Sequence, residues 1–164
     1  MPVIRRQLSM YVPSDSAKAI ENVRAIVDPM QHSLISAHVT LCKEDELLDF
    51  ASIQSRLEHI PFAPIALTFG RPVEFFAHGL LLPCIAGEQQ FRALREYILG
   101  SQNIKDQKPH MTLAHPRNPK SPGNSLAHAL RLPATIHLVF PTIRLIEQED
   151  TKPWQVLHVY ELAA

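Results

Sequence analysis

The sequence predicts an α+β fold of two similar lobes, with sheets that are mainly antiparallel. Two observations lead to this class. Strand-like and helix-like segments alternate along the 164 residues, and the connections between them are too short for many parallel crossovers. The order also repeats, since each half runs helix, strand, helix, strand, loop, strand, and the first strand of each half carries the tetrapeptide His-x-Thr-Leu. A repeat of this size sets the architecture, so we expect one domain over residues 1–164, with its two half-repeats related by an approximate two-fold axis.

The first half opens with a strand and a helix. Residues 14–27 have a polar cap at Ser14 or Asp15, and an apolar stripe at helical spacing follows it. A second helix is predicted at 45–60 and ends before Pro61. Short apolar or alternating runs, the last two on either side of a polar loop, predict strands at 4–12, 35–42, 64–70 and 79–85.

The second half repeats this order. Residues 87–100 predict a helix in which three apolar side chains share one face, and Gly100 occupies the position of a C-terminal glycine stop. Residues 124–132 predict a short helix. Further strand-like runs lie at 109–115, 134–147 and 153–162.

The two tetrapeptides begin at His38 and His110, 72 positions apart. The distance from each histidine to a phenylalanine later in its half is nearly equal, 31 residues to Phe69 and 30 to Phe140. Composition alone would give ~0.04 copies of His-x-Thr-Leu in a chain of this length, so two copies at matching positions are not a chance match.

In each copy the histidine and the threonine point to the same side of the strand, because side chains alternate along a strand. The apolar residues between and after them take the opposite side and can seal a core. If the two lobes face each other, one groove holds His38, Thr40, His110 and Thr112. A neutral imidazole can take a proton from water while a protonated one gives a proton to a leaving oxygen, and threonine hydroxyls can donate hydrogen bonds to phosphate oxygens. These residue types indicate phosphate-ester chemistry that requires no metal.

The paired motifs, HVTL at 38–41 and HMTL at 110–113, resemble those of the two-histidine phosphoesterase superfamily. Its members include bacterial 2′-5′ RNA ligases and 2′,3′-cyclic nucleotide phosphodiesterases. The resemblance covers nearly the whole chain. It implies a bilobal α+β fold in which mainly antiparallel sheets face a central cleft, with the helices outside. It also implies that His38 and His110 are the catalytic acid and base, and that Thr40 and Thr112 bind the phosphate.

The activity that the resemblance implies is that of a metal-independent enzyme without a cofactor. It would open 2′,3′-cyclic phosphates or related phosphodiesters of RNA ends or small nucleotides, and 2′-5′ RNA ligation is a related reaction. Which histidine is the base and which is the acid stays open.

Further substrate-binding residues are predicted near the second motif and in the first half of the chain. Many relatives carry an arginine shortly after it, whereas here His115 comes first and Arg117 follows. Phe76, in a loop of the first half, could stack on a base. Arg5 and Arg6 are neighbours on a predicted strand, so at most one of them can face the cleft.

Two other functions fit parts of the pattern. A nucleotide- or RNA-end-binding module could keep the cleft without turnover, although it would have little need for two titrating groups. A zinc-dependent hydrolase could use His110 and His115, whose H-x4-H spacing falls within some zinc patterns, but no cysteine pair or HExxH helix accompanies them.

The composition limits the partners. The formal net charge is zero, so we expect no extended binding to duplex nucleic acid. No stretch is apolar for long enough to cross a membrane, and the first residues do not resemble a signal peptide. Cys42 and Cys84 form no metal-type or redox-type pair. We expect a cytoplasmic protein and a monomer, whose partner is a small nucleotide or an RNA terminus with a cyclic phosphate.

Overall fold

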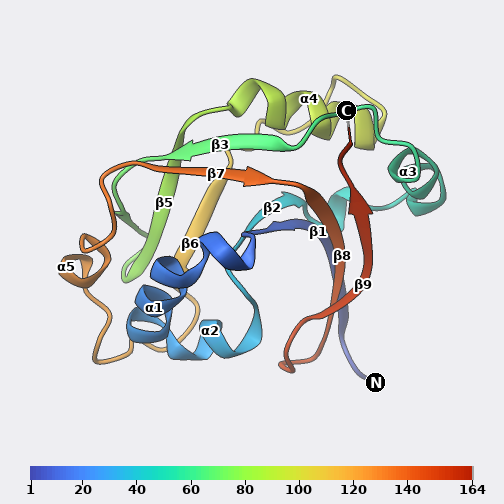
Figure 1. Ribbon diagram of the computed structural model, residues 1–164. Helices are drawn as coiled ribbons and strands as arrows, with labels where there is room; N and C mark the ends of the chain where they lie inside the picture. Colours follow the sequence, from blue (N-terminus) through green and yellow to red (C-terminus); the bar gives the residue numbers. More distant parts are fainter. Residues whose placement is uncertain (164) are drawn as a thin grey trace.

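The computed structural model describes residues 1–163, and its strands form two sheets. The first sheet has the order β2–β1–β8–β9, made of His38–Cys42, Ile4–Tyr11, Thr142–Glu149 and Gln155–Glu161. The second has the order β6–β5–β3–β7, made of His110–Ala114, Gly79–Ala86, Ile65–Phe69 and Ile136–Phe140, and the short β4, Val73–Phe75, pairs with the start of β5. Every pairing is antiparallel, which confirms the predicted α+β class (Figure 1).

The two sheets repeat one arrangement. In each sheet the His-x-Thr strand pairs with the strand that precedes a helix, so that β1–α1–β2 corresponds to β5–α4–β6, with α1 at Lys18–Val27 and α4 at Glu88–Leu99. Each helix lies near the motif strand of the other sheet, since α1 contacts β6 and α4 contacts β2. The sheets are nevertheless not the two halves of the chain. β8 and β9 complete the first sheet from the C-terminal end, and β3 of the first half belongs to the second sheet.

The strand predicted at 134–147 is two strands in the structure. Pro141 separates β7 from β8. Proline has no N–H to donate to a ladder, so the chain leaves the second sheet at this residue and enters the first. Figure 1 shows β7 running beside β3 before the chain turns into β8.

The helix predicted at 45–60 begins later than expected. A 3-10 turn, η2 (Glu44–Glu46), comes first, and α3 spans Phe50–Leu57. The Glu46 carboxylate accepts a hydrogen bond from the backbone N–H at the start of this turn and pairs with the Arg95 guanidinium. These contacts hold Glu46 in the turn, which separates it from the helix.

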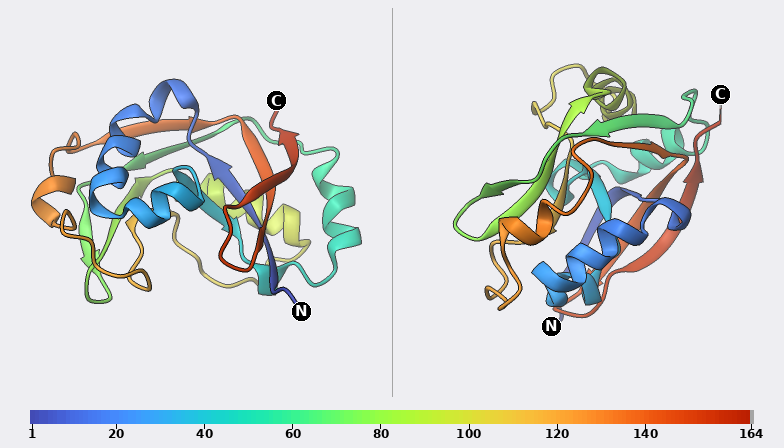
Figure 2. Two further views of the ribbon diagram at one scale, coloured as in Figure 1. Left: turned by 90° about the horizontal axis from the view of Figure 1, so that it is seen from below. Right: turned by 60° about the vertical axis from the view of Figure 1, so that its left-hand side comes forward.

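The helices lie on the outside of the molecule (Figure 2). Two of them are short, α2 at Pro29–Leu34 and α5 at Leu126–Ala129, and α2 was not predicted. Asp28 lies between α1 and α2 and caps α2, since its carboxylate accepts a hydrogen bond from the Gln31 backbone N–H (3.1 Å). Within the described chain, no helix has the length and apolar character that crossing a membrane would require.

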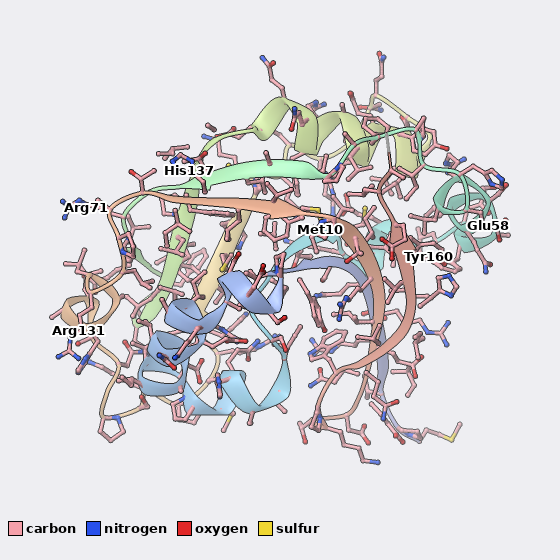
Figure 3. The ribbon with its side chains drawn as sticks, viewed as in Figure 1. Met10, Glu58, Arg71, Arg131, His137 and Tyr160 are labelled. Atoms are coloured by element: carbon pink, nitrogen blue, oxygen red, sulfur yellow. The ribbon has the colours of Figure 1, made fainter. Side chains whose placement is uncertain are left out.

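One hydrophobic cluster joins the two sheets. Its fully buried members come from both sheets and include Leu8, Met10, Leu41, Leu82 and Met111. Figure 3 shows Met10 in the interior, whereas the charged side chains of Glu58, Arg71 and Arg131 lie at the periphery. The single domain over residues 1–164 stays a prediction, and its last residue lies outside the described residues.

Candidate active site

β2 and β6 have the same alternation of side chains. In both strands the histidine and the threonine are partly exposed. The apolar residues between and after them have no exposed surface: Val39, Leu41, Met111 and Leu113. The two strands lie next to each other, with Cα atoms within 8 Å. The apolar side chains therefore anchor both strands in the core and leave the two His-Thr pairs on the open side, as the alternation predicts.

A cavity of about 460 Å³ lies over these two strands. Six of the residues predicted from the sequence line it: His38, Thr40, His110, Thr112, His115 and Arg117. Gln107 donates a hydrogen bond to the backbone carbonyl of Thr40 (3.0 Å), which fixes the strand and leaves the hydroxyl for a ligand. The structure thus brings together the residues of both motifs and the two candidates that follow the second motif.

Phe76 lies elsewhere. It is 82% exposed in the turn between β4 and β5 and does not line this cavity. Phe76 and Ala77 both have positive φ angles, 43° and 65°, which turn the chain back into β5. The sequence indicates a loop at Phe76, but the position of that loop relative to the cavity depends on how the sheets pack.

The two motif histidines are held in the same way. His38 Nδ1 lies 2.8 Å from the carbonyl oxygen of Ser36, and His110 Nδ1 lies 3.3 Å from that of Lys108. A carbonyl oxygen can only accept a hydrogen bond, so Nδ1 is the protonated nitrogen in both rings. When either ring is neutral, its Nε2 carries the lone pair and is the atom that can take or return a proton.

An ion pair between the buried Arg24 and the partly exposed Glu21 fixes the backbone before His38. The Arg24 guanidinium of α1 donates to the carbonyl of Ile35 (2.7 Å) and pairs with Glu21, whose carboxylate accepts from the Ala37 N–H (3.1 Å). These contacts bracket the Ser36 carbonyl that binds His38. Burial lowers the pKa of His38 to about 4, and the charges of Arg24 and His110 act in the same direction, against the opposing effects of the Ser36 carbonyl and Glu21.

Arg95 of α4 is the matching buried arginine of the second half. It donates to the carbonyls of Leu41 (2.6 Å) and Lys105 (3.3 Å) and makes two hydrogen bonds to Glu46 (3.0 and 2.7 Å). Arg24 and Arg95 each have 1% of their surface exposed. Arg95 therefore ties the end of the first motif to the segment that leads into the second.

The two arginines belong to a second internal repeat. Their helices share the pattern apolar-x-x-apolar-Arg-x-x-apolar, in Ile20–Val27 and in Phe91–Ile98. The copies lie 71 positions apart, close to the 72 of the histidines. The repeated helix pattern is visible in the sequence. It does not by itself predict buried arginines, because arginine is ordinarily found at the surface.

The loop after β6 is fixed by Asp28. Its carboxylate is buried and accepts from the backbone N–H of His115 (2.9 Å) and the side-chain amide of Asn118 (2.9 Å). His115 Nδ1 in turn accepts from the N–H of Arg117 (3.2 Å), so the proton of the neutral ring is on Nε2. Burial and the charge of Arg117 lower the pKa of His115 to about 4, with Asp28 opposing them. His115 therefore presents a neutral N–H donor, unlike the two motif histidines.

The cavity is rich in cations. Four cationic side chains line it, Arg5, Arg6, Lys43 and Arg117, and they outnumber its two carboxylates, Glu44 and Asp45, the second of which pairs with Lys105. Burial and the charge of Arg5 lower the pKa of Arg117 below the usual value of an arginine. The prediction that at most one of Arg5 and Arg6 reaches the cleft is wrong, since both line the cavity; Arg6 also pairs with Glu147 (2.6 Å). Arginines brought together in a partly buried site favour the binding of an anion.

The family model of the 2′-5′ RNA ligase superfamily matches residues 12–152, which include both motifs. The chain belongs to this superfamily. No curated protein sequence matches it.

Solved structures of similar length share the fold. LigT of E. coli in complex with ATP is 13% identical, with a TM-score of 0.63 and coverage of 100% of both chains. LigT in complex with 3′-AMP is 14% identical, with a TM-score of 0.61 and the same coverage. A protein of Thermus thermophilus is 21% identical, with a TM-score of 0.56 over 96% of this chain and 97% of its own. At these identities the likeness concerns the fold.

Some residues that line the cavity were not predicted from the sequence. Trp154 and Gln107 approach from the connection after β8 and the segment before β6. No motif marks either position, because each reaches the cavity through tertiary packing. Within residues 1–163, no group of three or more histidines, cysteines or carboxylates could hold a metal ion, so His110 and His115 gain no third ligand there.

Proposed function

We propose that this protein is a metal-independent phosphoesterase that opens 2′,3′-cyclic phosphates or closely related phosphodiesters of small nucleotides or RNA ends. The observation that carries the proposal is the pair of imidazoles in one cationic cavity, each held by a carbonyl at Nδ1 and each beside a threonine hydroxyl. The related E. coli LigT has been crystallised with phosphate, 3′-AMP, ATP and NADP+, which supports a small phosphorylated nucleotide as the ligand class.

In the proposed reaction His38 is the general base and His110 the general acid. The environment of His38 keeps its ring neutral, so Nε2 can take a proton from water. The water oxygen bonds to phosphorus as the bond from phosphorus to one ribose oxygen breaks. His110 Nε2–H gives its proton to that leaving oxygen, and exchange with solvent restores both rings. Attack by a ribose hydroxyl instead of water would give 2′-5′ ligation through the same groups.

The other polar groups would stabilise the charge that develops on the phosphate. The hydroxyls of Thr40 and Thr112 donate to the non-bridging oxygens, and the neutral Nε2–H of His115 and the guanidinium of Arg117 add further donors. These donors are held by strands or by the Asp28 network before the substrate arrives.

Turnover of adenosine 2′,3′-cyclic phosphate in excess EDTA, followed by phosphorus NMR, tests the proposal. A single phosphomonoester that accumulates at an undiminished rate supports metal-independent ring opening and identifies the bond that breaks. Activity that EDTA abolishes would favour the zinc enzyme. If the protein binds nucleotide but forms no product, it is a binding module with the same cleft.

The pH dependence of kcat/KM tests the assignment of the base. His38 must be unprotonated to accept a proton, so kcat/KM should fall as the pH drops through its pKa of about 4. Between pH 5 and pH 7 no acid limb is expected, whereas a base with an ordinary histidine pKa of about 6.5 would lose activity there. Circular dichroism at each pH separates loss of activity from unfolding. A limb near pH 6.5 that disappears in His38→Ala would contradict the lowered pKa.

The valine variants of the motif threonines test the phosphate contacts. Thr40→Val and Thr112→Val keep the shape and the strand propensity but remove the hydroxyl. We expect each variant to have a lower kcat/KM. The decrease should correspond to a loss of up to about 3 kcal/mol of transition-state stabilisation. Thr68→Val is the matched control, since Thr68 lies on β3 and bonds to His137, outside the cavity. Unchanged kinetics in both motif variants would mean that the hydroxyls do not touch the phosphate.

A further inference from the structure

A cavity of about 570 Å³ lies where the end of β1, the start of α1 and the start of β8 meet. It shares no lining residue with the catalytic cavity over β2 and β6, and we call it the second cavity. Its polar lining includes Tyr11, Lys18, Ser36, Thr142 and Arg144. We propose that the second cavity binds a phosphoryl group and that this occupant affects the reaction through His38. The effect on the reaction rests on the proposed function, whereas the binding of the anion does not.

The two cations of the second cavity have no carboxylate partner. Within residues 1–163, neither Lys18 nor Arg144 forms an ion pair. Arg144 is partly buried, and its buried Nε–H has no hydrogen-bond partner in that range. The carboxylate in the wall, that of Glu21, is already bonded to Arg24 and to the Ala37 N–H. A buried donor without an acceptor is costly, so this site favours an anion that can accept from it.

The internal repeat indicates that the fold does not require these groups. Beside the first motif, Tyr11 is the register partner of His38, and Arg144 lies on the next strand, β8. Beside the second motif, Pro83 takes the place of Tyr11, and Val73 of β4 takes the place of Arg144. The second half therefore builds the same strand arrangement with neither a hydroxyl nor a charge at these positions.

The hydroxyls of the second cavity suit a tetrahedral anion. Burial raises the pKa of Tyr11 to about 12, against the opposing charges of Arg144 and Arg24, so its hydroxyl stays protonated and can donate. A phosphoryl group presents oxygens in several directions and can accept from hydroxyls and from both cations at once, whereas a carboxylate presents two oxygens in one plane. The hydroxyls that line the cavity are those of Tyr11, Ser14, Ser36 and Thr142.

Two residues connect the second cavity to His38. The centre of the Tyr11 ring lies 6.1 Å from that of the His38 ring, and the Arg144 guanidinium lies over the Tyr11 ring, 4.9 Å from its centre. The Ser36 carbonyl holds His38 Nδ1 (2.8 Å). Both Tyr11 and Ser36 line the second cavity. An anion bound there contacts the residues that position the proposed base, so its binding changes the surroundings of His38.

Isothermal titration calorimetry with inorganic phosphate tests the binding. The wild-type protein should bind two phosphate ions, one in each cavity. Arg144→Met should weaken one of the two sites about tenfold or more and leave the other within about twofold, because a charged donor is lost from one site alone. Lys18→Met should weaken the same site about threefold, and Lys18 is exposed, so this change leaves the fold intact. A single phosphate site in the wild type, or two unchanged sites in both variants, would overturn the proposal.

Two further variants assign the sites. Arg117→Met should weaken the other phosphate site, since Arg117 lines the catalytic cavity and not the second one. Arg71→Met is the matched control, because Arg71 is an exposed arginine at the periphery that lines neither cavity (Figure 3). It should leave both affinities unchanged. Equal weakening of both sites by Arg71→Met would mean that the overall charge of the protein, and not a built site, holds the second ion.

Turnover distinguishes two sources of the phosphoryl group. If it is a free ion, phosphate should change kcat at saturating adenosine 2′,3′-cyclic phosphate, and Arg144→Met should abolish this change. If it belongs to the substrate, a dinucleotide with a terminal cyclic phosphate should have a kcat/KM about tenfold above that of the mononucleotide, and Arg144→Met should remove the difference. If neither effect is seen, the link between the second cavity and His38 is wrong.

The second cavity and the proposed function can fail separately. If two phosphate ions bind as expected but no cyclic phosphate is opened, the anion site stands and the enzyme proposal fails. If cyclic phosphates are opened and only one phosphate ion binds, the phosphoesterase stands and the second site is wrong.

Discussion

Replacing His110 with alanine should lower kcat at least about a hundredfold and leave the fold intact. The side chain lies on the open side of β6, and its removal touches none of the buried residues that anchor the strand. Loss of a positioned proton-transfer group costs about 10²- to 10⁴-fold. His38→Ala should have an effect of similar size, because the proposed reaction moves one proton through each ring. Turnover of adenosine 2′,3′-cyclic phosphate measures the rate, and circular dichroism checks the fold.

The leaving group separates the acid from the base. A 4-nitrophenyl phosphodiester expels a stable anion that needs no proton, so it should restore much of the rate to His110→Ala and little to His38→Ala. His137→Ala is the matched control, since this histidine lies on β7 and its ring bonds to Thr68, away from the cavity. The reverse rescue would exchange the two roles, and near-full turnover by either motif variant would remove that histidine from the mechanism.

The parts of the site that the sequence predicted are those governed by local periodicity. The alternation along β2 and β6 puts His38 and Thr40, like their counterparts in the second half, on the open side, and the structure has this pattern. The repeat also indicated that the two strands occupy equivalent positions. Side-chain direction in a strand depends only on the chain itself, so it can be read before the fold is known.

The parts that the sequence did not predict depend on contacts between distant segments. Trp154 reaches the cavity because β8 and β9 join the first sheet and their connection is fastened to α2. Phe76, another aromatic residue in the sequence, is 82% exposed in the turn between β4 and β5 and does not line the cavity. The split at Pro141 was visible as a proline within a strand, but the switch between sheets that it marks was not.

The buried arginines connect the fold to the site, and Arg95→Met should be the most destabilising of the changes considered. Methionine replaces the aliphatic stem of arginine but lacks the guanidinium, so it leaves the Glu46 carboxylate, of which only 8% is exposed, without its partner. Breaking a buried pair by removing one member costs about 3–5 kcal/mol. The carbonyls of Leu41 and Lys105 also lose their donor. Urea unfolding of the variant and the wild type measures the difference in free energy of unfolding.

Arg92→Met is the matched control, because Arg92 lies one turn earlier on α4 and is 42% exposed. Its contacts are long: ion pairs at 3.7 Å to Glu96 and Asp106, and a hydrogen bond of 3.4 Å to the carbonyl of Gln102. Its loss should cost less than about 1 kcal/mol. The double variant with Glu46→Gln and Arg95→Met should recover part of the lost stability. The glutamine carries no charge, so no buried charge is left without a partner. Equal effects of the two methionine variants would mean that burial of Arg95 contributes nothing. A large effect confined to Arg95 would instead show that the link between the two motif strands holds the fold together as well as the site.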